Sequence, residues 1–386
     1  MKKKIIALLL VGLVILLTAC SGSPDTNTPD TGDTSSGSSE YDFSDVSPMT
    51  FRVATALPST HVQWTQFHEP FMKECEELSG GKITFETYTA GELIESGKEY
   101  DGLIGGIIDI AAPISHIYNP TIFPASDFTM LPLGSSDAVI GSKAWQAMLK
   151  SDVEVLPGKT YVEYEFYDRG LYPMAVNIAP DAVVATTGKE FSSLEAISKM
   201  RLRSGSSVHT IFFTKLGVNP ISMPVFDMFD AMSRGALDGG AQFIADWPAY
   251  GFEELYKYAV TGVNLGHFAS VWAMDLDKWN ALPDVVKELF QDEGEKLIIP
   301  GAEYFLGLKE EVVEKTTETG TKFVDISELP ADVQKKFSEA VAATWSDWIS
   351  TKEAEGYPAK AVAKLWRDCI VDAGGTVPDS VNQLFE

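Results

Sequence analysis

FRVATALPSTHVQWTQFHEPFMKECEELSGGKITFETY, residues 51–88, decides the fold of the chain. Apolar residues alternate from Phe51 to Leu57, as in a strand, and recur at helical spacing from Val62 to Leu78. Gly80-Gly81 ends the helix, and Lys82 to Tyr88 has the pattern of a second strand. The stretch therefore predicts two strands joined by a helix, the unit that builds parallel sheets.

The pattern continues along the chain. Glu95 to Ile104 has helical spacing, and Ile107 to Ile114 is an apolar strand after a Gly-Gly turn. This alternation of strands and helices predicts a parallel sheet with helices on both faces. We expect a further helix at Asp137 to Lys150 and two strands at Tyr161 to Asp168 and Tyr172 to Asn177.

The alternation restarts near residue 200, which predicts a second α/β lobe. Its expected strands are Met200 to Arg203, Asn219 to Met223 and Ala236 to Phe243, and its expected helices are Val208 to Leu216 and Phe226 to Ser233.

The C-terminal part consists of long helical stretches, at 283–318 with an expected kink at Pro300-Gly301, and then at 329–355 and 358–373. We therefore expect an α/β fold of two α/β lobes, joined by crossing strands and braced by these helices. The expected bounds are 49–165 plus part of the C-terminal region for the first lobe, 175–275 for the second, and 283–386 for the bracing helices.

The N-terminus has the features of an exported protein. Lys2 to Lys4 precede an apolar run from Ile5 to Leu17 that is too short for a stable membrane span, so residues 1–19 are interpreted as a signal peptide. Leu17-Thr18-Ala19-Cys20 resembles the lipobox of bacterial lipoproteins, which implies that Cys20 carries the lipid. The alternative is an ordinary cleaved signal followed by an incidental cysteine.

The next segment has the composition of a tether. Ser21 to Ser47 is mostly Ser, Thr, Gly, Pro and Asp without Lys or Arg, so it cannot bury enough apolar surface to offset its ordering entropy. We expect residues 20–48 to form a lipidated, disordered tether. It would hold the folded part outside the cytoplasmic membrane, in the periplasm or at the cell surface.

Charge and cysteine content limit the possible partners. The chain has 30 basic and 55 acidic residues, and removing Lys2 to Lys4 leaves 27 against 55, a net charge of −28. This balance argues against nucleic acid as a partner. Cys75 and Cys369 either form one disulfide or remain two buried thiols. No cluster has metal-ligand spacing, so we expect neither a metal ion nor a cofactor.

A series of short motifs carries a family resemblance because their order and spacing run over nearly all of the chain after the tether. They are Val53-Ala54-Thr55 with His61, 79–83, 88–93, Gly106 with 108–111, 131–133, 200–203, 216–220, Met223-Pro224, 230–232, 235–239, and 277–279 before Leu282-Pro283. On these motifs the chain resembles the solute-binding proteins of TRAP transporters, the dicarboxylate-type periplasmic family.

This resemblance implies a periplasmic-binding-protein fold at 49–386 and a receptor function. The protein would capture a small organic acid in the cleft between its lobes and deliver it to the membrane subunits of a transporter driven by an ion gradient. The family's central residue is an arginine at a strand end, whose planar guanidinium matches a carboxylate. Arg203 and Arg201 both compete for this role, and the distance to Leu216-Gly217 favours Arg203.

Other expected ligand contacts follow strand ends or the family pattern. Tyr172 stands where the family often has a second arginine, and Arg169 is an adjacent candidate. Gln242 and Phe243 end a strand of the second lobe, and in open α/β sheets ligands lie at the carboxyl ends of strands. The same argument applies, more weakly, to two residues that follow strands of the first lobe, which are His61 and Tyr118.

Two other classes of function compete with the receptor. An exported, lipid-anchored hydrolase acting on a small carboxylated substrate is one, but the sequence has no Gly-x-Ser-x-Gly, no His-Glu-x-x-His and no phosphate loop. A scaffold or adhesion lipoprotein is the other, and it needs no polar cleft. We therefore expect no catalytic residues.

Overall fold

The first β-sheet combines the N-terminal repeat with two strands from later in the chain. The computed structural model describes residues 41–386. The sheet has the order β2-β1-β3-β12-β6. Its strands are β1 (Met49–Ala54), β2 (Ile83–Tyr88), β3 (Ile110–Ile114), β12 (Val271–Asp275) and β6 (Leu171–Ala175). β1 is parallel to β2 and β3, as predicted, whereas β12 is antiparallel to β3 and β6.

The second β-sheet has the order β13-β11-β7-β10-β8-β9. Its strands are β7 (Ala182–Thr186), β8 (Leu202–Ser204), β9 (Ile221–Ser222), β10 (Gly239–Phe243), β11 (Tyr258–Thr261) and β13 (Lys322–Asp325). β8 is parallel to both neighbours, β10 and β9, while β7 is antiparallel to β10 and β11. The two predicted α/β lobes are therefore present, and β6 and β12 belong to the first of them.

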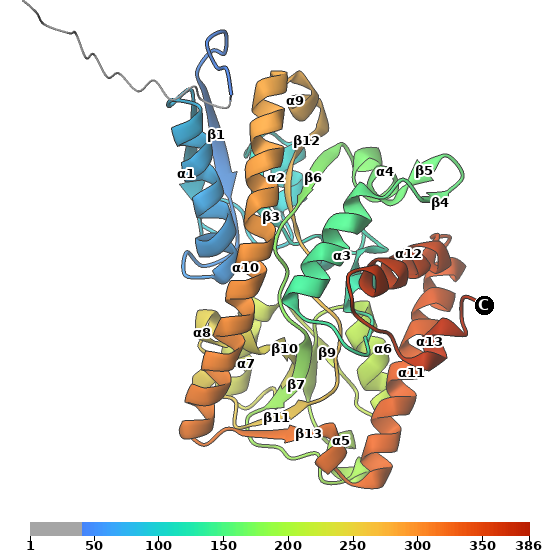
Figure 1. Ribbon diagram of the computed structural model, residues 1–386. Helices are drawn as coiled ribbons and strands as arrows, with labels where there is room; N and C mark the ends of the chain where they lie inside the picture. The colour runs from blue at the N-terminus through green and yellow to red at the C-terminus, as the bar shows by residue number, and fades with distance from the viewer. Residues whose placement is uncertain (1–40) are drawn as a thin grey trace, which may run out of the picture. The chain divides into compact units, whose positions relative to one another are not determined.

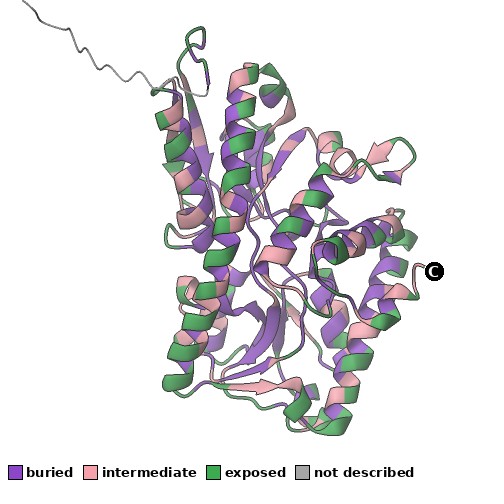
Figure 2. Ribbon diagram, viewed as in Figure 1, coloured by how far each residue is buried: buried purple, intermediate pink, exposed green. Residues whose placement is uncertain are grey.

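Helices pack on both sheets, with their inner faces buried and their outer faces exposed (Figure 2). The first lobe carries α1 (Glu69–Leu78), α2 (Glu99–Ile104), α3 (Ala138–Lys150), α4 (Tyr161–Glu165) and α9 (Leu276–Ala281). The second carries α5 (Leu194–Ser198), α6 (Ser207–Leu216), α7 (Met228–Ser233) and α8 (Trp247–Tyr250). The C-terminal helices are α10 (Asp284–Glu318), α11 (Ala331–Ala354), α12 (Ala359–Asp372) and α13 (Asp379–Asn382).

The helix α10 runs beside both lobes (Figure 1). It packs on α1, α3 and β6 of the first lobe and on β13 of the second. Because one continuous helix contacts both lobes, α10 braces them, as the long C-terminal stretch predicts. Pro300 lies inside α10 and does not end it.

The chain crosses between the lobes after β6, after β11 and along α10. Gln63 holds the first two crossings together, since its Nε2 donates to the backbone oxygen of Asn177 at 2.7 Å and to Ser270 Oγ at 3.1 Å. The third crossing lies against the first at Gly301, where a Cβ atom would come within 2.9 Å of the Asn177 side chain. These contacts hold the three crossing segments close together.

The folded body begins earlier than the predicted tether boundary allows. We expected residues 20–48 to be a tether, but Tyr41, Phe43 and Val46 are buried in the core of the first lobe. Tyr41 also donates to Asp292 Oδ2 on α10 at 3.0 Å, and Lys82 Nζ donates to the backbone oxygen of Val46 at 2.8 Å. Two aromatic rings and a valine bury enough apolar surface to hold this short segment in place.

One predicted strand is wrong. Tyr161 to Asp168, expected as a strand, contains the helix α4 and a further helical turn at Tyr167–Arg169. The cause is local, because the Thr160 side chain accepts from the Glu163 backbone while the Glu163 carboxylate accepts from the Thr160 backbone. This capping box starts a helix and outweighs the β propensity of the tyrosines and the valine.

Two observations concern the predicted disulfide alternative and the predicted export of the protein. Cys75 and Cys369 are both buried and free, so the described chain has two thiols rather than a disulfide. Among residues 41–386, no helix combines the length and the apolar character that a membrane span needs. The predicted signal peptide and Cys20 lie outside the described residues.

Candidate functional site

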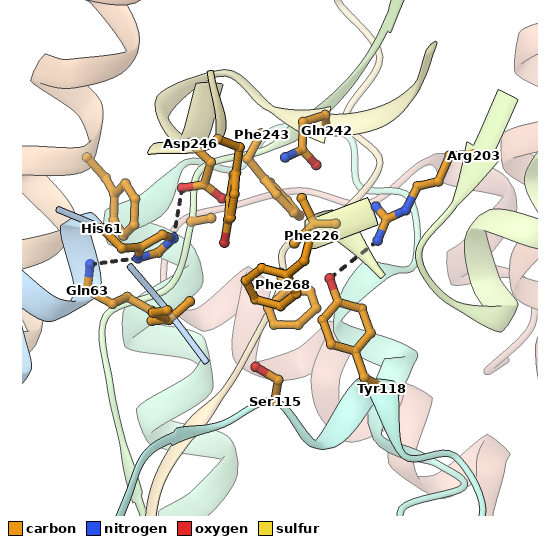
Figure 3. A pocket seen from close by; sticks show the side chains of 15 residues that line it. His61, Gln63, Ser115, Tyr118, Arg203, Phe226, Gln242, Phe243, Asp246 and Phe268 are labelled. Atoms are coloured by element: carbon orange, nitrogen blue, oxygen red, sulfur yellow. Dashed lines mark hydrogen bonds and ion pairs between the residues drawn. The ribbon is translucent and has the colours of Figure 1, made fainter. Parts of the chain in front are cut away.

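A cavity lies between the two lobes, and fifteen residues line it (Figure 3). The first lobe contributes residues that follow β1 and β3, among them His61, Ser115 and Tyr118, while the second contributes Arg203 and residues around the end of β10. The cavity is small, with a volume of about 40 Å³. The lobes therefore enclose a space suited to a small molecule.

Arg203 brings a positive charge to this cavity, and its hydrogen-bond partners within the described part of the chain are all neutral. It lies on β8, between β10 and β9, and is 2% exposed. Its Nε donates to the backbone oxygen of Met223 at 2.8 Å, and its Nη2 donates to Tyr118 Oη at 3.3 Å. Its one further hydrogen bond within the described residues, from Nη1 to the Ala241 backbone oxygen, is long at 3.5 Å. No carboxylate within residues 41–386 forms an ion pair with Arg203.

Two glycines make room for this arginine. A Cβ atom on Gly205 would lie within 2.6 Å of Arg203 Nη1, and one on Gly240 would lie 2.7 Å from the Arg203 backbone oxygen. Gly240 thus lets β10 approach β8 closely, and Gly205 leaves the guanidinium its space. Any side chain at Gly205 would push the guanidinium out of its place.

Arg201 has a different environment. Its Nε and Nη2 donate to the two carboxylate oxygens of Asp238 at 3.1 and 2.7 Å, and its side chain is 49% exposed. Burial pushes the pKa of Asp238 up, but the hydrogen bonds from Arg201 outweigh it and hold that pKa below its usual value. Arg201 is therefore committed to a protein carboxylate and does not line the cavity.

Six of the fifteen residues that line the cavity are phenylalanines or tyrosines. They are Tyr118, Phe226, Phe243, Tyr250, Phe268 and Phe305. Phe268 contacts Tyr118 with ring centres 5.3 Å apart and Phe243 at 6.4 Å, and Phe226 contacts Tyr250 at 5.7 Å. A wall of flat faces favours an apolar, flat ligand body.

Gln242 adds an unused donor beside Arg203. It lies on β10, is 1% exposed, and its Nε2 has no hydrogen-bond partner within the described chain. Figure 3 shows its amide on the same side of the cavity as the guanidinium. A buried amide donor without a partner is unfavourable by roughly 1–3 kcal/mol, so a ligand acceptor here would stabilise the site.

A second polar group lies away from Arg203, beyond the rings in Figure 3. His61 Nε2 faces Asp246 Oδ1 at 3.6 Å, which is longer than a hydrogen bond. Burial lowers the pKa of His61 to about 4 and raises the pKa of Asp246 to about 7. Because His61 gives up its proton well below the pH at which Asp246 ionises, the contact is not an ion pair near neutral pH.

Five of the predicted ligand residues line this one cavity, namely Arg203, Gln242, His61, Tyr118 and Phe243. Sequence reasoning missed Asp246, Phe226, Tyr250, Phe268 and Phe305. Asp246 follows Gln242 and Phe243 closely, so the strand-end argument could have included it. Phe268 and Phe305 lie on a crossing segment and on α10, where the sequence offers no signal for a ligand contact.

Two predicted residues lie elsewhere. Tyr172 stacks on Trp279 with ring centres 3.7 Å apart and accepts from Gln291 Nε2 at 2.7 Å, in a separate hollow of the first lobe. Arg169 donates to the backbone oxygens of Ile122, Tyr164 and Glu165, and its Nη2 lies 3.5 Å from Glu165 Oε2. Neither lines the Arg203 cavity, because each side chain is held by its own partners.

The described residues contain no group of three or more His, Cys, Asp or Glu side chains arranged to hold a metal ion. Two α/β lobes, joined by crossing segments around a cavity with an unpaired cation, define a two-lobed ligand receptor. The chain belongs to the family described as bacterial extracellular solute-binding protein, family 7, whose model matches residues 53–352. This family consists of solute receptors rather than enzymes and acts outside the cytoplasm.

Solved structures of similar fold come from the same kind of receptor. A TRAP solute-binding protein from a marine metagenome, specific for aromatic acids and bound to metahydroxyphenylacetate, has a TM-score of 0.74 at 20% identity, covering 84% of this chain and 99% of its own. A TRAP protein from Rhodoferax ferrireducens with copurified benzoate has a TM-score of 0.72 at 19% identity, covering 84% and 98%. A third, from a marine metagenome and specific for pyroglutamate, has 0.70 at 16% identity, covering 83% and 99%.

Proposed function

We propose that Arg203 binds the carboxylate of a small organic acid and that the protein delivers this acid to a TRAP-type transporter. The observation that carries the proposal is a fully buried guanidinium without an anionic partner in residues 41–386. A buried cation is costly unless an anion or several hydrogen bonds compensate it. A ligand carboxylate supplies the anion, and the paired donors of a guanidinium match its two oxygens.

The cavity favours one carboxylate on a flat body. Among residues 41–386, Arg203 is the one arginine or lysine that lines it, so this part of the chain offers no second such cation to a dicarboxylate. Gln242 Nε2 adds a neutral donor near Arg203, and the rings around Phe243 and Phe268 suit an apolar face. The structural relatives bind both aromatic acids and pyroglutamate, so similarity to them does not select a ligand. The aromatic side chains that line this cavity are what favour a ligand with a ring.

Closure of the lobes traps the ligand in this account. Tyr118 belongs to the first lobe and Arg203 to the second, so the hydrogen bond between them joins the lobes across the cavity. A ligand that contacts both lobes stabilises the closed form over the open one, which is a population shift. The closed form then docks on the membrane subunits of the transporter.

We also propose that Cys20 carries the lipid anchor that keeps the receptor near its transporter. The lipobox-like Leu17-Thr18-Ala19-Cys20 and the polar segment that follows support this. Labelling with a fatty-acid probe tests it. Cys20→Ala is expected to abolish labelling and release the protein, and unchanged labelling would contradict the proposal.

Mass spectrometry of the protein purified from its own host tests the central proposal. Gentle denaturation is expected to release a small molecule with one carboxylate. Arg203→Lys serves as a matched variant, because it keeps the charge but loses the planar pair of donors; it should retain much less ligand than the parent protein. A released ligand that lacks a carboxylate would overturn the role of Arg203.

A further inference from the structure

We infer that the ligand carries a hydroxyl group at the end remote from its carboxylate, bound between His61 and Asp246. This inference rests on the proposed function, since Arg203 fixes the carboxylate end. The two ends of the cavity differ in chemistry: donors gather around Arg203, whereas an imidazole and a carboxyl group face each other around Asp246 (Figure 3).

The tautomer of His61 follows from its hydrogen bond. Its Nδ1 accepts from the backbone N–H of Gln63 at 3.2 Å. In a neutral imidazole the other nitrogen then carries the hydrogen, so Nε2 is a donor that points toward Asp246. The 3.6 Å between Nε2 and Asp246 Oδ1 leaves this donor without a direct hydrogen bond to the carboxyl group.

Asp246 offers the complementary acceptor. It lies in the helical turn Ile244–Asp246 directly after β10 and is 8% exposed. Its Oδ1 has no hydrogen-bond partner within residues 41–386. A buried carboxyl oxygen without a partner is as unusual as the unpaired Gln242 donor at the other end, and it too calls for a ligand group.

A hydroxyl satisfies both groups at once. Its oxygen accepts from His61 Nε2–H while its hydrogen is donated to Asp246 Oδ1. A methyl group would leave both unpaired, and an ammonium could not accept from the imidazole. The rings of Tyr250 and Phe226 lie beside this end, with the ring centres of His61 and Tyr250 5.9 Å apart, so the hydroxyl sits on a flat body. The chemical class is a hydroxylated ring acid.

The test compares matched acids that differ by one hydroxyl. Benzoate and phenylacetate are titrated calorimetrically against each of their ring-hydroxylated isomers. An ordinary hydrogen bond contributes roughly 0.5–1.5 kcal/mol, and the hydroxyl makes two of them, so at least one isomer is expected to bind about tenfold or more tightly than its parent. Equal affinity for parent and isomers, or binding of no acid in the set, would overturn the inference.

Variants of Asp246 test its part in that preference. Asp246→Leu removes both oxygens at similar volume and should bring the affinity ratio of isomer to parent close to one, whereas Asp246→Asn keeps one acceptor and should reduce the ratio less. Asp230→Leu, the same change on an exposed residue of α7, is the control and should keep the ratio of the unmodified protein. A ratio that survives Asp246→Leu would contradict the inference.

Failure of the inference is distinguishable from failure of the proposed function. If benzoate binds as tightly as its isomers and Arg203→Ala abolishes that binding, the protein is a carboxylate receptor, but the proposed hydroxyl site between His61 and Asp246 is wrong. If the host-purified protein releases a carboxylate without a hydroxyl, the outcome is the same. A released ligand with no carboxylate would overturn both.

Discussion

Two arginines stand two residues apart at strand β8, and the protein uses them in opposite ways. The half-exposed Arg201 side chain donates two hydrogen bonds to Asp238, while Arg203 is buried and, within residues 41–386, bonds only to neutral oxygens. The same contrast holds for two carboxylates. Asp238 is paired and its pKa is lowered, whereas Asp246 faces the cavity and burial raises its pKa to about 7.

This difference teaches how to separate structural charges from binding charges. An exposed ion pair contributes about 0–1 kcal/mol and needs no ligand. A buried charge without a counter-charge destabilises the empty protein, and it persists where a ligand supplies the partner. The paired charges of Arg201 and Asp238 thus have a structural role, whereas the unpaired groups around Arg203 are available to bind a ligand.

The largest expected effect comes from Arg203→Ala. Truncating one partner of a buried charge pair costs roughly 2–5 kcal/mol, so the affinity for a ligand acid should fall by about 100-fold or more in calorimetry. The melting temperature of the ligand-free protein should stay nearly unchanged, because the change removes a buried charge that has no counter-ion. Arg201→Ala is the control and should bind within about twofold of the parent protein. If Arg201→Ala lost binding and Arg203→Ala did not, Arg201 rather than Arg203 would be the carboxylate-binding residue.

Gln242→Leu is expected to weaken binding about tenfold. The substitution removes a neutral donor beside the ligand carboxylate, and one hydrogen bond to a charged group contributes roughly 1.5–3 kcal/mol. The ligand-free variant should melt at or above the parent temperature, since its unpaired Nε2 is gone. Unchanged affinity would place the carboxylate away from this end of the cavity.

Arg201→Ala is expected to act on stability instead. It leaves the largely buried Asp238 carboxylate without its two charge-assisted hydrogen bonds. The free energy of unfolding, measured by urea denaturation, is expected to fall below that of the parent protein, because the buried carboxylate loses its partner. A stability equal to that of the parent would show that the Arg201 pair does not support the fold.

The two aspartates should respond to pH in opposite directions. The pKa of Asp246 is raised, so the folded state holds a proton that the unfolded chain releases above about pH 4, and stability falls as pH rises toward 7. Asp246→Asn should therefore gain melting temperature over the parent between pH 5 and 8, by a few degrees. Asp238 stabilises above its unfolded pKa, and this contribution is lost as pH falls through its lowered folded pKa.

Asp238→Asn should accordingly be less stable than the parent at pH 7 and approach it in acid. Melting curves recorded from pH 3 to 8 give both differences directly. Parallel curves for Asp246→Asn and the parent would show that Asp246 does not titrate in this window, and would weaken the contrast between paired and unpaired carboxylates.

Much of this architecture was predictable because strand and helix periods are local. The segment 51–88 and the restart near residue 200 gave both lobes, and strand ends pointed to Arg203 and Gln242. Tyr172 lies outside the Arg203 cavity because it stacks on Trp279, which is far away in sequence and which no local pattern pairs with it. Phe305 lines the cavity from α10, and although the long helix itself was predicted, its pattern does not indicate which of its side chains faces the cavity.

A crystal structure of the protein with the ligand that co-purifies from its host tests the central claim most directly. The account predicts one ligand carboxylate within hydrogen-bonding distance of the Arg203 guanidinium, with Arg201 still on Asp238. A ligand seated elsewhere, or one whose carboxylate is bound away from Arg203, would contradict it.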